Sequence, residues 1–563
     1  MKKPLPIGYD NYKRIISDEL YYVDKTLIIK ELLDKKGQVN LFTRPRRFGK
    51  TLILSMLRTF FEQDTDVHGK VTDNSHFFDG MKIMQAGERY VSKLGQYPVI
   101  SLSLKSGKQP TFEIAYQCLV DEIVKEYERH RYVLLGEQLL DSTKEKYRLV
   151  MERKAEPSAY AKGLEFLSAC LREYHGKNTI ILIDEYDVPL ENAHFAGFYD
   201  EMIGFIRSLF ESALKTNDNL EFAVVTGCLR ISKESIFTGL NNLKIISILS
   251  LDYAEYFGFT QSEVEDMLAY YGLEHKLEEV REWYNGYVFG DTQVYNPWSV
   301  INYVDAGKGQ PDAFPKPYWS NTSSNSIVRE LIEAADENTK REIEGLIAGG
   351  TIEKPVHEEI TYADIHTTKD NLWNFLFFTG YLKAIDKRFE VDTTYLTMKI
   401  PNVEIRYIYR YTIREWFSQR ITKTDFTELY RSILEGSCEE IEQFINKQLA
   451  TSISYHDAVE NFYHGYMLGI LSCFEGYAIE SNREHGDGRP DLVLSPHDPK
   501  KSVIIIEVKR AEKYSEMEKK CQEALEQIED KNYAAEYLEE GYKGVVKFGF
   551  CFCKKSCMVK MGN

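Results

Sequence analysis

Short, mainly apolar runs recur along the first 250 residues and alternate with segments of helical periodicity. The runs are VNLFTRP (39–45), PVISLSL (98–104), TIILIDEYD (179–187) and FAVVTG (222–227). Such runs are typical of strands buried on both faces of a parallel sheet. LILSMLRTFFE, which follows the first run, has apolar residues at helical spacing. Residues 1–250 are therefore predicted to form an α/β domain.

The pattern changes near Leu251, where short helices and turns replace the apolar runs. Residues 251–345 are predicted to form a helical or winged-helix-like lid, with a helix that starts after Pro297. Residues 346–450 are predicted to be a mostly helical connector with one hairpin around Thr393 to Ile400. We see no candidate chemistry in this connector.

The last part, residues 451–563, returns to an α/β pattern. A helix with a strong apolar face, DAVENFYHGYMLGILSCF, precedes three strand-like runs, YAIESNRE, RPDLVLS and SVIIIEVKR. A charged helix over 511–537 and the strand GVVKFGFCFC follow. The order predicts a second α/β domain.

Composition limits the location and the partners of the chain. A length of 563 residues indicates several domains, and the net charge of -17 argues against non-specific coating of nucleic acid, so any such contact needs a local basic patch. We find no apolar run long enough to span a membrane and no apolar leader, which predicts a cytoplasmic protein without membrane contact. The nine cysteines are expected to be reduced thiols. The cluster Cys551, Cys553 and Cys557 lacks the second pair that a zinc site usually needs.

The turn RPRRFGKT (44–51) matches the end of the phosphate-binding pattern G-x-x-x-x-G-K-[ST], with Arg44 at the position of the first Gly. Lys50 is predicted to bridge the β- and γ-phosphates of ATP, and Thr51 to bind Mg²⁺ through its hydroxyl. A solvated basic turn before an ordinary helix is the alternative. The residues predicted to bind the nucleotide in this turn are Arg46, Arg47, Phe48, Gly49, Lys50 and Thr51.

The strand IILIDE supports the nucleotide site because it ends in two acids. Asp184 is predicted to hold the metal, and Glu185 to orient and deprotonate the attacking water. Thr226, at the end of FAVVTG, is predicted to contact the γ-phosphate. Arg230 and Lys233 follow and can reach the nucleotide, although a simple strand-to-loop exit explains them and Thr226 equally well.

A second carboxylate set lies near the C-terminus. Glu507 and Lys509 are two positions apart in a strand and therefore project to one face, and a hairpin brings Asp491 beside them. Two carboxylates and an ammonium are the groups that Mg²⁺-assisted phosphodiester hydrolysis needs. Glu460 is a further candidate metal ligand, and Gln527 a candidate for positioning water or phosphate. The alternative is a surface hairpin with an exposed ion pair.

Several longer segments resemble those of bacterial AAA-ATPase-like proteins. They are YYVDKTLIIKELL, RPRRFGKTL, IDEYD and TGCLRISKESIFTGLNN, with WYNGY and YNPWSV in the lid region. SNREHGDGRPDLVL, IIIEVKR and ALEQIEDKNY resemble the PD-(D/E)XK nuclease domain of the same proteins. The resemblance is least specific over residues 326–448.

The resemblance implies a P-loop NTPase sheet with a lid, followed by a restriction-endonuclease-like domain. By carry-over, Lys50, Thr51, Asp184 and Glu185 serve ATP, and Asp491, Glu507 and Lys509 serve the nuclease. An Arg at the position of Arg44 is common in the family. DNA rather than RNA is the expected substrate, a homo-oligomer is an expected state, and a role in defence or mobile-element control is analogy only.

Three functions remain open from the sequence. The first is an ATP-regulated, Mg²⁺-dependent nuclease. The second is a signalling NTPase switch whose nuclease-like domain only binds a partner. The third is a scaffold without either activity, which the intact Lys50, Asp184 and Glu507 disfavour.

Overall fold

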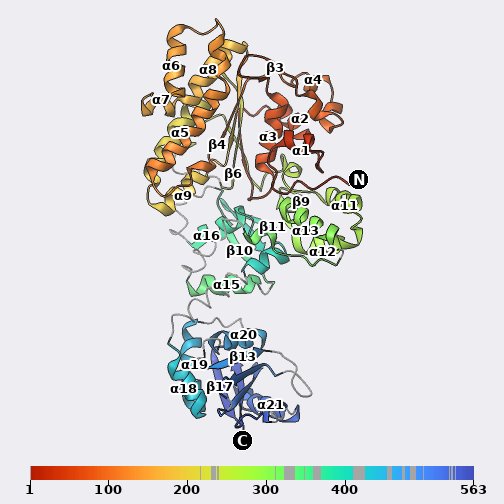
Figure 1. Ribbon diagram of the computed structural model, residues 1–563, viewed down its shortest axis with the longest axis vertical. Coiled ribbons are helices and arrows are strands. Elements are labelled where there is room, and N and C mark those ends of the chain that lie inside the picture. The colour runs from red at the N-terminus through yellow and green to blue at the C-terminus, as the bar shows by residue number, and fades with distance from the viewer. Residues whose placement is uncertain are drawn as a thin grey trace. The chain divides into compact units, whose positions relative to one another are not determined.

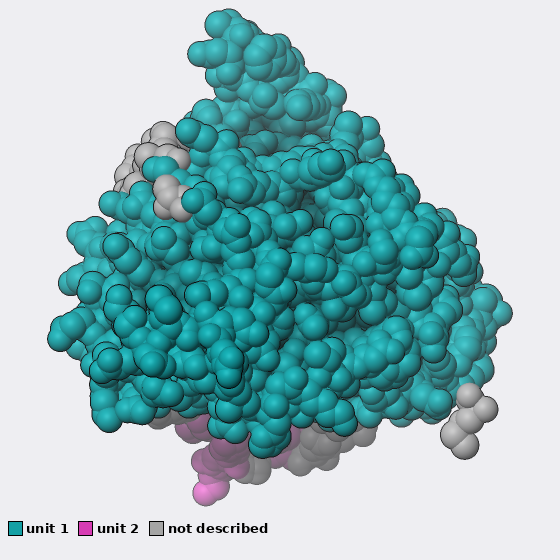
Figure 2. Space-filling view, turned by 90° about the horizontal axis from the view of Figure 1, so that it is seen from above, with its two compact units in different colours: residues 1–325, 351–408 teal, residues 326–350, 409–563 magenta. Residues whose placement is uncertain are grey.

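The structure is a computed structural model of the chain, which forms two compact units (Figure 2). Unit 1 comprises Met1–Asn325 and Thr351–Ile408, and unit 2 comprises Ser326–Gly350 and Tyr409–Asn563. The residues that the structure describes are 2–215, 217–229, 236–237, 240–310, 312–321, 336–347, 349–358, 369–409, 425–452, 460–471, 474, 476–481, 490–498, 500–531, 533, 537–538 and 541–562.

Unit 1 is built on a five-stranded sheet in the order β4-β5-β6-β1-β7, and every neighbouring pair of strands is parallel. The strands are β1 (Val39–Thr43), β4 (Val99–Ser103), β5 (Thr179–Asp184), β6 (Leu220–Gly227) and β7 (Leu243–Ile246). β1 and β5 are buried along their whole length. The parallel sheet predicted from the four apolar runs is confirmed, and β7 is an additional edge strand.

Helices cover both faces of this sheet, as a parallel sheet requires. Figure 1 shows α1, α2 and α3 on one side and α5, α6 and α8 on the other. The helices of this layer are α1 (Tyr12–Ser17), α2 (Leu27–Lys35), α3 (Lys50–Phe61), α4 (Glu88–Val91), α5 (Phe112–Arg129), α6 (Asp141–Met151), α7 (Pro157–Ala161), α8 (Gly163–His175), α9 (Val188–Ala196) and α10 (Tyr199–Phe210).

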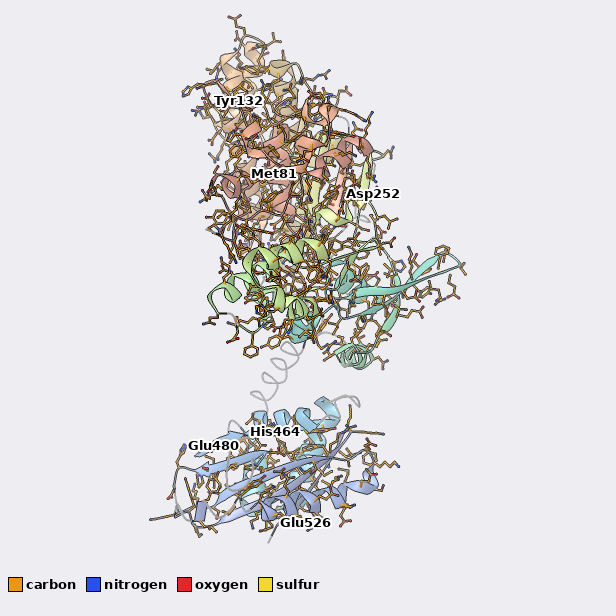
Figure 3. All side chains as sticks on the ribbon, turned by 90° about the vertical axis from the view of Figure 1, so that its right-hand side faces the viewer. Met81, Tyr132, Asp252, His464, Glu480 and Glu526 are labelled. Carbon is orange, nitrogen blue, oxygen red and sulfur yellow. The ribbon has the colours of Figure 1, made fainter. Side chains whose placement is uncertain are left out.

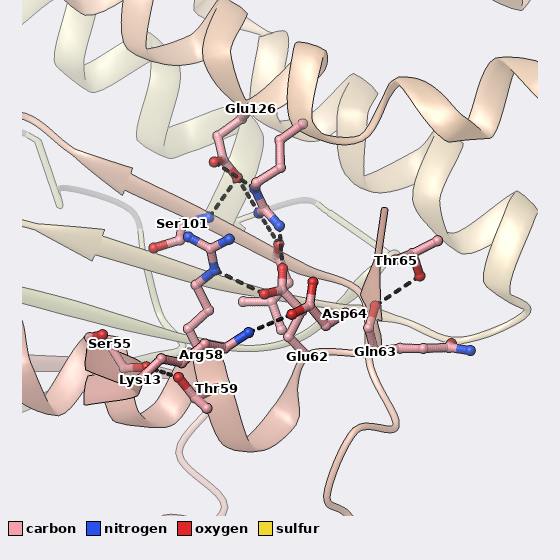
Figure 4. A network of polar contacts seen from close by, with 12 residues as sticks. Lys13, Ser55, Arg58, Thr59, Glu62, Gln63, Asp64, Thr65, Ser101 and Glu126 are labelled. Atoms are coloured by element: carbon pink, nitrogen blue, oxygen red, sulfur yellow. Dashed lines mark hydrogen bonds and ion pairs between the residues drawn. The ribbon is translucent and has the colours of Figure 1, made fainter. Parts of the chain in front are cut away.

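A buried network of charged groups fixes the C-terminal end of α3 to β4 and α5 (Figure 4). Glu62 follows α3 and pairs with Arg58 at 2.9 Å and with Arg129 of α5. Arg129 also pairs with Glu126, whose carboxylate accepts a hydrogen bond of 2.9 Å from the backbone N–H of Ser101 in β4. Removal of one partner from such a pair leaves an uncompensated buried charge. The network therefore holds α3 in place from the end opposite Lys50.

A small helical subdomain follows the sheet in unit 1. Its elements are α11 (Gln261–Tyr271), α12 (Leu277–Tyr284), α13 (Pro297–Gly309) and the hairpin of β8 (Tyr287–Phe289) and β9 (Thr292–Val294). The helix expected after Pro297 is present, and it begins at this proline, with Asn296 as its N-cap. Lys25, near the N-terminus, is buried and pairs with Glu263 of α11 at 2.6 Å. The subdomain is thus attached to the N-terminal segment.

Three strands and a helix complete unit 1. β10 (Ile352–Val356), β12 (Thr393–Lys399) and β11 (Lys383–Glu390) form an antiparallel sheet in that order, beside α16 (Lys369–Phe378). The hairpin predicted around Thr393 to Ile400 is the β11–β12 hairpin. β10 is an additional strand that the sequence pattern does not predict.

Unit 2 is built on a mixed sheet in the order β13-β14-β15-β16-β17, in which only β15 and β16 are parallel. The elements of the unit are α15 (Glu337–Ile347), α18 (Thr427–Glu435), α19 (Cys438–Ser452), α20 (Glu460–Leu471), α21 (Met517–Asp530), β13 (Tyr477–Ser481), β14 (Leu492–Pro496), β15 (Val503–Arg510), β16 (Val545–Cys553) and β17 (Ser556–Met561).

The residues of β15 alternate between two cores. Ile504 and Ile506 pack in a core shared with α18, α19 and α20. Val503 and Ile505 pack in a separate core with α21. Because alternate strand residues point to opposite faces, Glu507 and Lys509 belong to the α21 face.

Among the residues described above, no helix has both the length and the apolar character that crossing a membrane requires.

Candidate functional sites

The turn RPRRFGKT (44–51) lies at the carboxyl edge of the parallel sheet, where ligands bind in open α/β sheets. It connects the end of β1 to the start of α3. Gly49 is the N-cap of α3 and has φ 81°, a left-handed conformation that favours glycine. In the described part of the chain no side chain caps the first turn of α3, and this turn contains no acidic residue. The helix terminus therefore offers backbone N–H groups and a positive dipole end to an anion.

Lys50 is the first residue of α3, and it is buried. Its Nζ donates hydrogen bonds to the carbonyl oxygens of Arg44 at 2.8 Å and Pro45 at 2.9 Å. The ammonium group thus holds the turn closed around itself. Both acceptors are neutral carbonyls, so the positive charge of Lys50 is not compensated by these two contacts.

Asp184, the last residue of β5, links α3 and β6 at this edge. Its Oδ2 accepts a hydrogen bond of 2.6 Å from Thr51 Oγ1, and its Oδ1 accepts one from Thr226 Oγ1. β6 lies between β1 and β5, so Thr226 belongs to the strand next to that of Asp184. The structure brings together the two hydroxyls and the carboxylate singled out in the sequence. This all-oxygen set suits a hard divalent cation such as Mg²⁺.

Glu185, the next residue, is half-buried and has φ 53°. Burial raises the pKa of its carboxyl above the usual value, and the neighbouring charge of Asp184 raises it further. A carboxylate with a raised pKa is a better proton acceptor at neutral pH. The position and the electrostatics of Glu185 fit a general base.

Asp187 has a role in this site that the sequence did not indicate. It is buried, and its Oδ2 accepts hydrogen bonds from the backbone N–H groups of Cys228 at 2.7 Å and Leu229 at 3.1 Å. These two residues follow β6, so Asp187 fixes the segment directly after Thr226. The second aspartate of IDEYD is the only sequence signal, and a backbone contact cannot be inferred from it.

The other side chains of the turn contact protein groups. Arg46 pairs with Glu191 of α9 at 2.6 Å. The guanidinium of Arg47 lies 4.3 Å from the ring centroid of Trp298 in α13. Phe48 is buried against the β8–β9 hairpin. To contact a nucleotide as predicted, these residues would therefore have to use their backbone groups or change their side-chain conformations.

The second candidate site lies where β14 and β15 run side by side in unit 2. Asp491 directly precedes β14, and its backbone N–H donates to Glu507 Oε2 at 3.3 Å. Its own Oδ2 accepts a hydrogen bond of 2.8 Å from the backbone N–H of Val508. The expected meeting of Asp491 with Glu507 is confirmed.

Glu507 is 1% exposed and accepts further hydrogen bonds. Lys509 Nζ donates to its Oε1 at 3.2 Å, and Gln527 Nε2 of α21 donates to the same oxygen. Burial raises the pKa of Glu507 from 4.5 to about 7, with Asp491 as the next cause, while Lys509 acts in the opposite direction. The carboxyl therefore exchanges its proton near neutral pH.

His464 of α20 is a neighbour that sequence reasoning missed (Figure 3). Its Nε2 lies 2.8 Å from the carbonyl oxygen of Asp491. The contact fixes the backbone that carries Asp491. The side chain of Glu460, on the same helix, and the residues Arg230 and Lys233 lie outside the described residues.

Gly549 allows α21 to approach the sheet closely enough to place Gln527 at Glu507. It pairs with Glu507 across β15 and β16, and a Cβ on it would lie 2.4 Å from the carbonyl oxygen of Cys521 in α21. We expect Gly549→Ala to lower the free energy of unfolding of unit 2 by about 1–3 kcal/mol, the usual range for overpacking. Denaturant unfolding followed by circular dichroism measures the change. Gly345→Ala in α15 is the control, because among the described residues no atom lies within 4 Å of a Cβ there and its φ is not in the left-handed region.

Neither site brings many carboxylates together. Over the part of the chain that the structure describes, no group of three or more His, Cys, Asp or Glu side chains is arranged to hold a metal ion. Asp184 with two hydroxyls, and Asp491 with Glu507, nevertheless present the oxygen ligands that Mg²⁺ takes together with water and phosphate. Both donor sets fit such an ion.

The fold and the two sites define a P-loop-like α/β domain followed by a mixed-sheet α/β nuclease-like domain. Residues 6–237 match the family described as a predicted AAA-ATPase, and residues 458–561 match the PD-(D/E)XK nuclease superfamily. The chain thus has an ATPase–nuclease arrangement of domains. Both families generally use divalent metal ions, and the ATPase family a nucleotide.

A protein of Azotobacter chroococcum mcd 1, described as an uncharacterized protein in the vnfD 5' region, is 27% identical over 338 residues. The alignment covers 59% of this chain and 56% of that protein. The chain thus matches little more than half the length of this relative.

Proposed function

We propose that unit 1 binds and hydrolyses ATP at the edge formed by the turn, β5 and β6. The observation that carries the proposal is the double hydrogen bond from Thr51 and Thr226 to Asp184 beside the uncapped N-terminus of α3. Thr51 and Asp184 would hold Mg²⁺, which neutralises phosphate charge when it is bound. The backbone N–H groups of the turn would bind the phosphate oxygens.

Lys50 and Glu185 have complementary roles in this proposal. Lys50 would exchange its two carbonyl acceptors for phosphate oxygens, which are stronger partners because they are charged. Glu185 would accept the proton of the attacking water, and Thr226 would orient the terminal phosphate. The raised pKa of Glu185 supports the assignment of this proton acceptor.

Unit 2, in the same proposal, is a Mg²⁺-dependent nuclease that acts on DNA. Asp491 and Glu507 would bind the metal ion, with Glu460 as a further ligand. Lys509 would stabilise the charge that develops on the phosphate, and Gln527 would keep Glu507 oriented. The shared contacts of Glu507 with Lys509 and Gln527 support these roles. Homo-oligomer formation and a cytoplasmic location stay predictions, and a role in defence or mobile-element control rests on fold-level analogy.

A second candidate is a nucleotide-controlled switch whose nuclease-like domain only binds a partner. One observation favours it, because Glu507 is almost completely buried and its oxygens already have protein partners. A metal ion must displace the Lys509 or Gln527 contact before it can bind Glu507. The switch would require ATP turnover but no phosphodiester cleavage.

The test measures ATP turnover and nucleic-acid cleavage by the full chain in the same buffer. Single- and double-stranded DNA and RNA are incubated with Mg²⁺, without nucleotide, with ATP and with a non-hydrolysable ATP analogue. We expect Mg²⁺-dependent ATP turnover, and DNA cleavage that changes with the nucleotide. Turnover without cleavage of any substrate would select the switch. The absence of both activities would refute the ATPase and nuclease proposals together.

A further inference from the structure

Arg44 occupies the position that is glycine in the usual phosphate-binding pattern, and its side chain is completely buried. The guanidinium carbon lies 5.1 Å from the ring centroid of Phe257 and 5.0 Å from that of Phe289. Burial lowers the pKa of Arg44 to about 9, so the group stays charged at neutral pH. A desolvated cation beside aromatic rings is held more strongly than an exposed one.

The polar contacts of Arg44 join the strands on both sides of β1. Its backbone N–H donates to the carbonyl oxygen of Gly227, the last residue of β6, at 3.0 Å. Its NH1 donates to the carbonyl oxygens of Thr43 at 3.0 Å and of Ile246, the last residue of β7, at 2.9 Å. Among the residues that the structure describes, Nε and NH2 are buried without a hydrogen-bond partner, and the two rings lie beside the guanidinium. The guanidinium of Arg44 thus lies between the end of β7 and the two rings.

The same ring that contacts Arg44 also supports the outer part of the turn. Phe48 packs on Phe289 at 5.2 Å and on Tyr287 at 4.9 Å between ring centroids. The β8–β9 hairpin that carries both rings is fixed to the sheet edge by a hydrogen bond of 2.8 Å from Gly290 N to Ile248 O. Two side chains of the turn are therefore anchored on one hairpin.

We propose that Arg44 is a positioning residue that holds the phosphate-binding turn against the β8–β9 hairpin, so that packing of the hairpin determines the affinity for ATP. Arg44 does not bind phosphate in this arrangement. A glycine has no side chain to provide this support, and here the support comes from Phe257 and Phe289. The inference rests on the ATPase proposal for its consequence, but the attachment of the hairpin is measurable without nucleotide.

Arg44→Gly restores the usual pattern and is the decisive variant. If Arg44 positions the turn, we expect the KM for ATP to rise about tenfold or more, with a smaller fall in kcat, because Arg44 does not contact Asp184 or Glu185. Arg44→Lys keeps the charge but not the planar group, and its KM for ATP should lie between those of the wild type and Arg44→Gly. Phe289→Leu should raise KM in the same direction. Phe78→Leu, at a buried ring among Tyr12 and Phe60, is the matched control and should leave KM unchanged.

Hydrogen exchange without nucleotide provides the second measurement. We expect the backbone N–H groups of residues 287–294 to exchange faster in Arg44→Gly and Phe289→Leu than in the wild type and in Phe78→Leu. Unchanged exchange together with an unchanged KM in Arg44→Gly would overturn the inference. If Arg44→Gly does not fold, Arg44→Lys and Phe289→Leu decide. If the wild type does not turn over ATP, the ATPase proposal fails, whereas the exchange result still decides whether Arg44 holds the hairpin.

Discussion

Replacement of Asp184 by asparagine is expected to reduce ATP hydrolysis by about a hundredfold or more while the fold of unit 1 is retained. Asparagine has nearly the same size and keeps one acceptor oxygen for the hydroxyl of Thr51 or Thr226. The hydroxyl that then faces the amide N–H₂ can turn and accept a hydrogen bond, since a hydroxyl both donates and accepts. What is lost is the negative charge that a divalent cation needs.

Phosphate release by purified full-length protein at several Mg²⁺ concentrations measures the effect. Asp252→Asn is the matched control, because Asp252 is a partly exposed aspartate of unit 1 (Figure 3) that pairs with Lys35 and Lys244. Its turnover should equal that of the wild type. Glu185→Gln distinguishes the role of Glu185 from that of Asp184, because this variant should lose turnover but keep Mg²⁺-dependent ATP binding. Full turnover in Asp184→Asn would show that hydrolysis occurs elsewhere.

The sheet of unit 1 could be predicted because its central strands are buried on both faces. β1 and β5 have no exposed position, and their sequences, VNLFT and TIILID, are correspondingly mainly apolar. β7, at the edge, is only partly buried at three of its four positions, and its sequence LKII includes a lysine. A four-residue strand of this kind has no distinctive period. Its existence depends on pairing with β1, which is a long-range contact.

The region after residue 325 was harder to predict because its helices and strands pack on distant elements. α18 and α19 share one core with the sheet of β13–β17, although α20 separates them from the strands in sequence. Their apolar residues have helical spacing, which indicates a helix but not its partner. Likewise β10 pairs with β12, although α16 and β11 lie between them in sequence.

The candidate sites show the same division between local and distant information. The closeness of Asp491, Glu507 and Lys509 follows from strand alternation and a hairpin, which are local rules. The burial of Phe48 against Phe289 depends on a hairpin more than two hundred positions later, and no spacing rule predicts it. Contacts through backbone groups, such as His464 with the carbonyl of Asp491, have no side-chain pattern either.

Replacement of Glu507 by glutamine is expected to reduce DNA cleavage by about a thousandfold. Glutamine keeps the shape and one acceptor oxygen for Lys509 or Gln527, but it cannot supply the charge that binds the metal ion. Glu526→Gln is the matched control, because Glu526 is an exposed glutamate of α21, next to Gln527 (Figure 3). Cleavage of a labelled duplex is measured at several Mg²⁺ concentrations, and the control should cleave like the wild type.

The pH dependence of the wild type tests the same residue independently. Burial raises the pKa of Glu507 to about 7, so the carboxyl holds a proton at pH 6 that a metal ion must displace. At low Mg²⁺ concentration, cleavage should therefore rise about fivefold between pH 6 and pH 7 and about tenfold by pH 8, and level off above that. The residual activity of Glu507→Gln should lack this rise, because glutamine has no proton to lose. Wild-type rates in Glu507→Gln at every pH would show that unit 2 does not cleave DNA through this carboxylate.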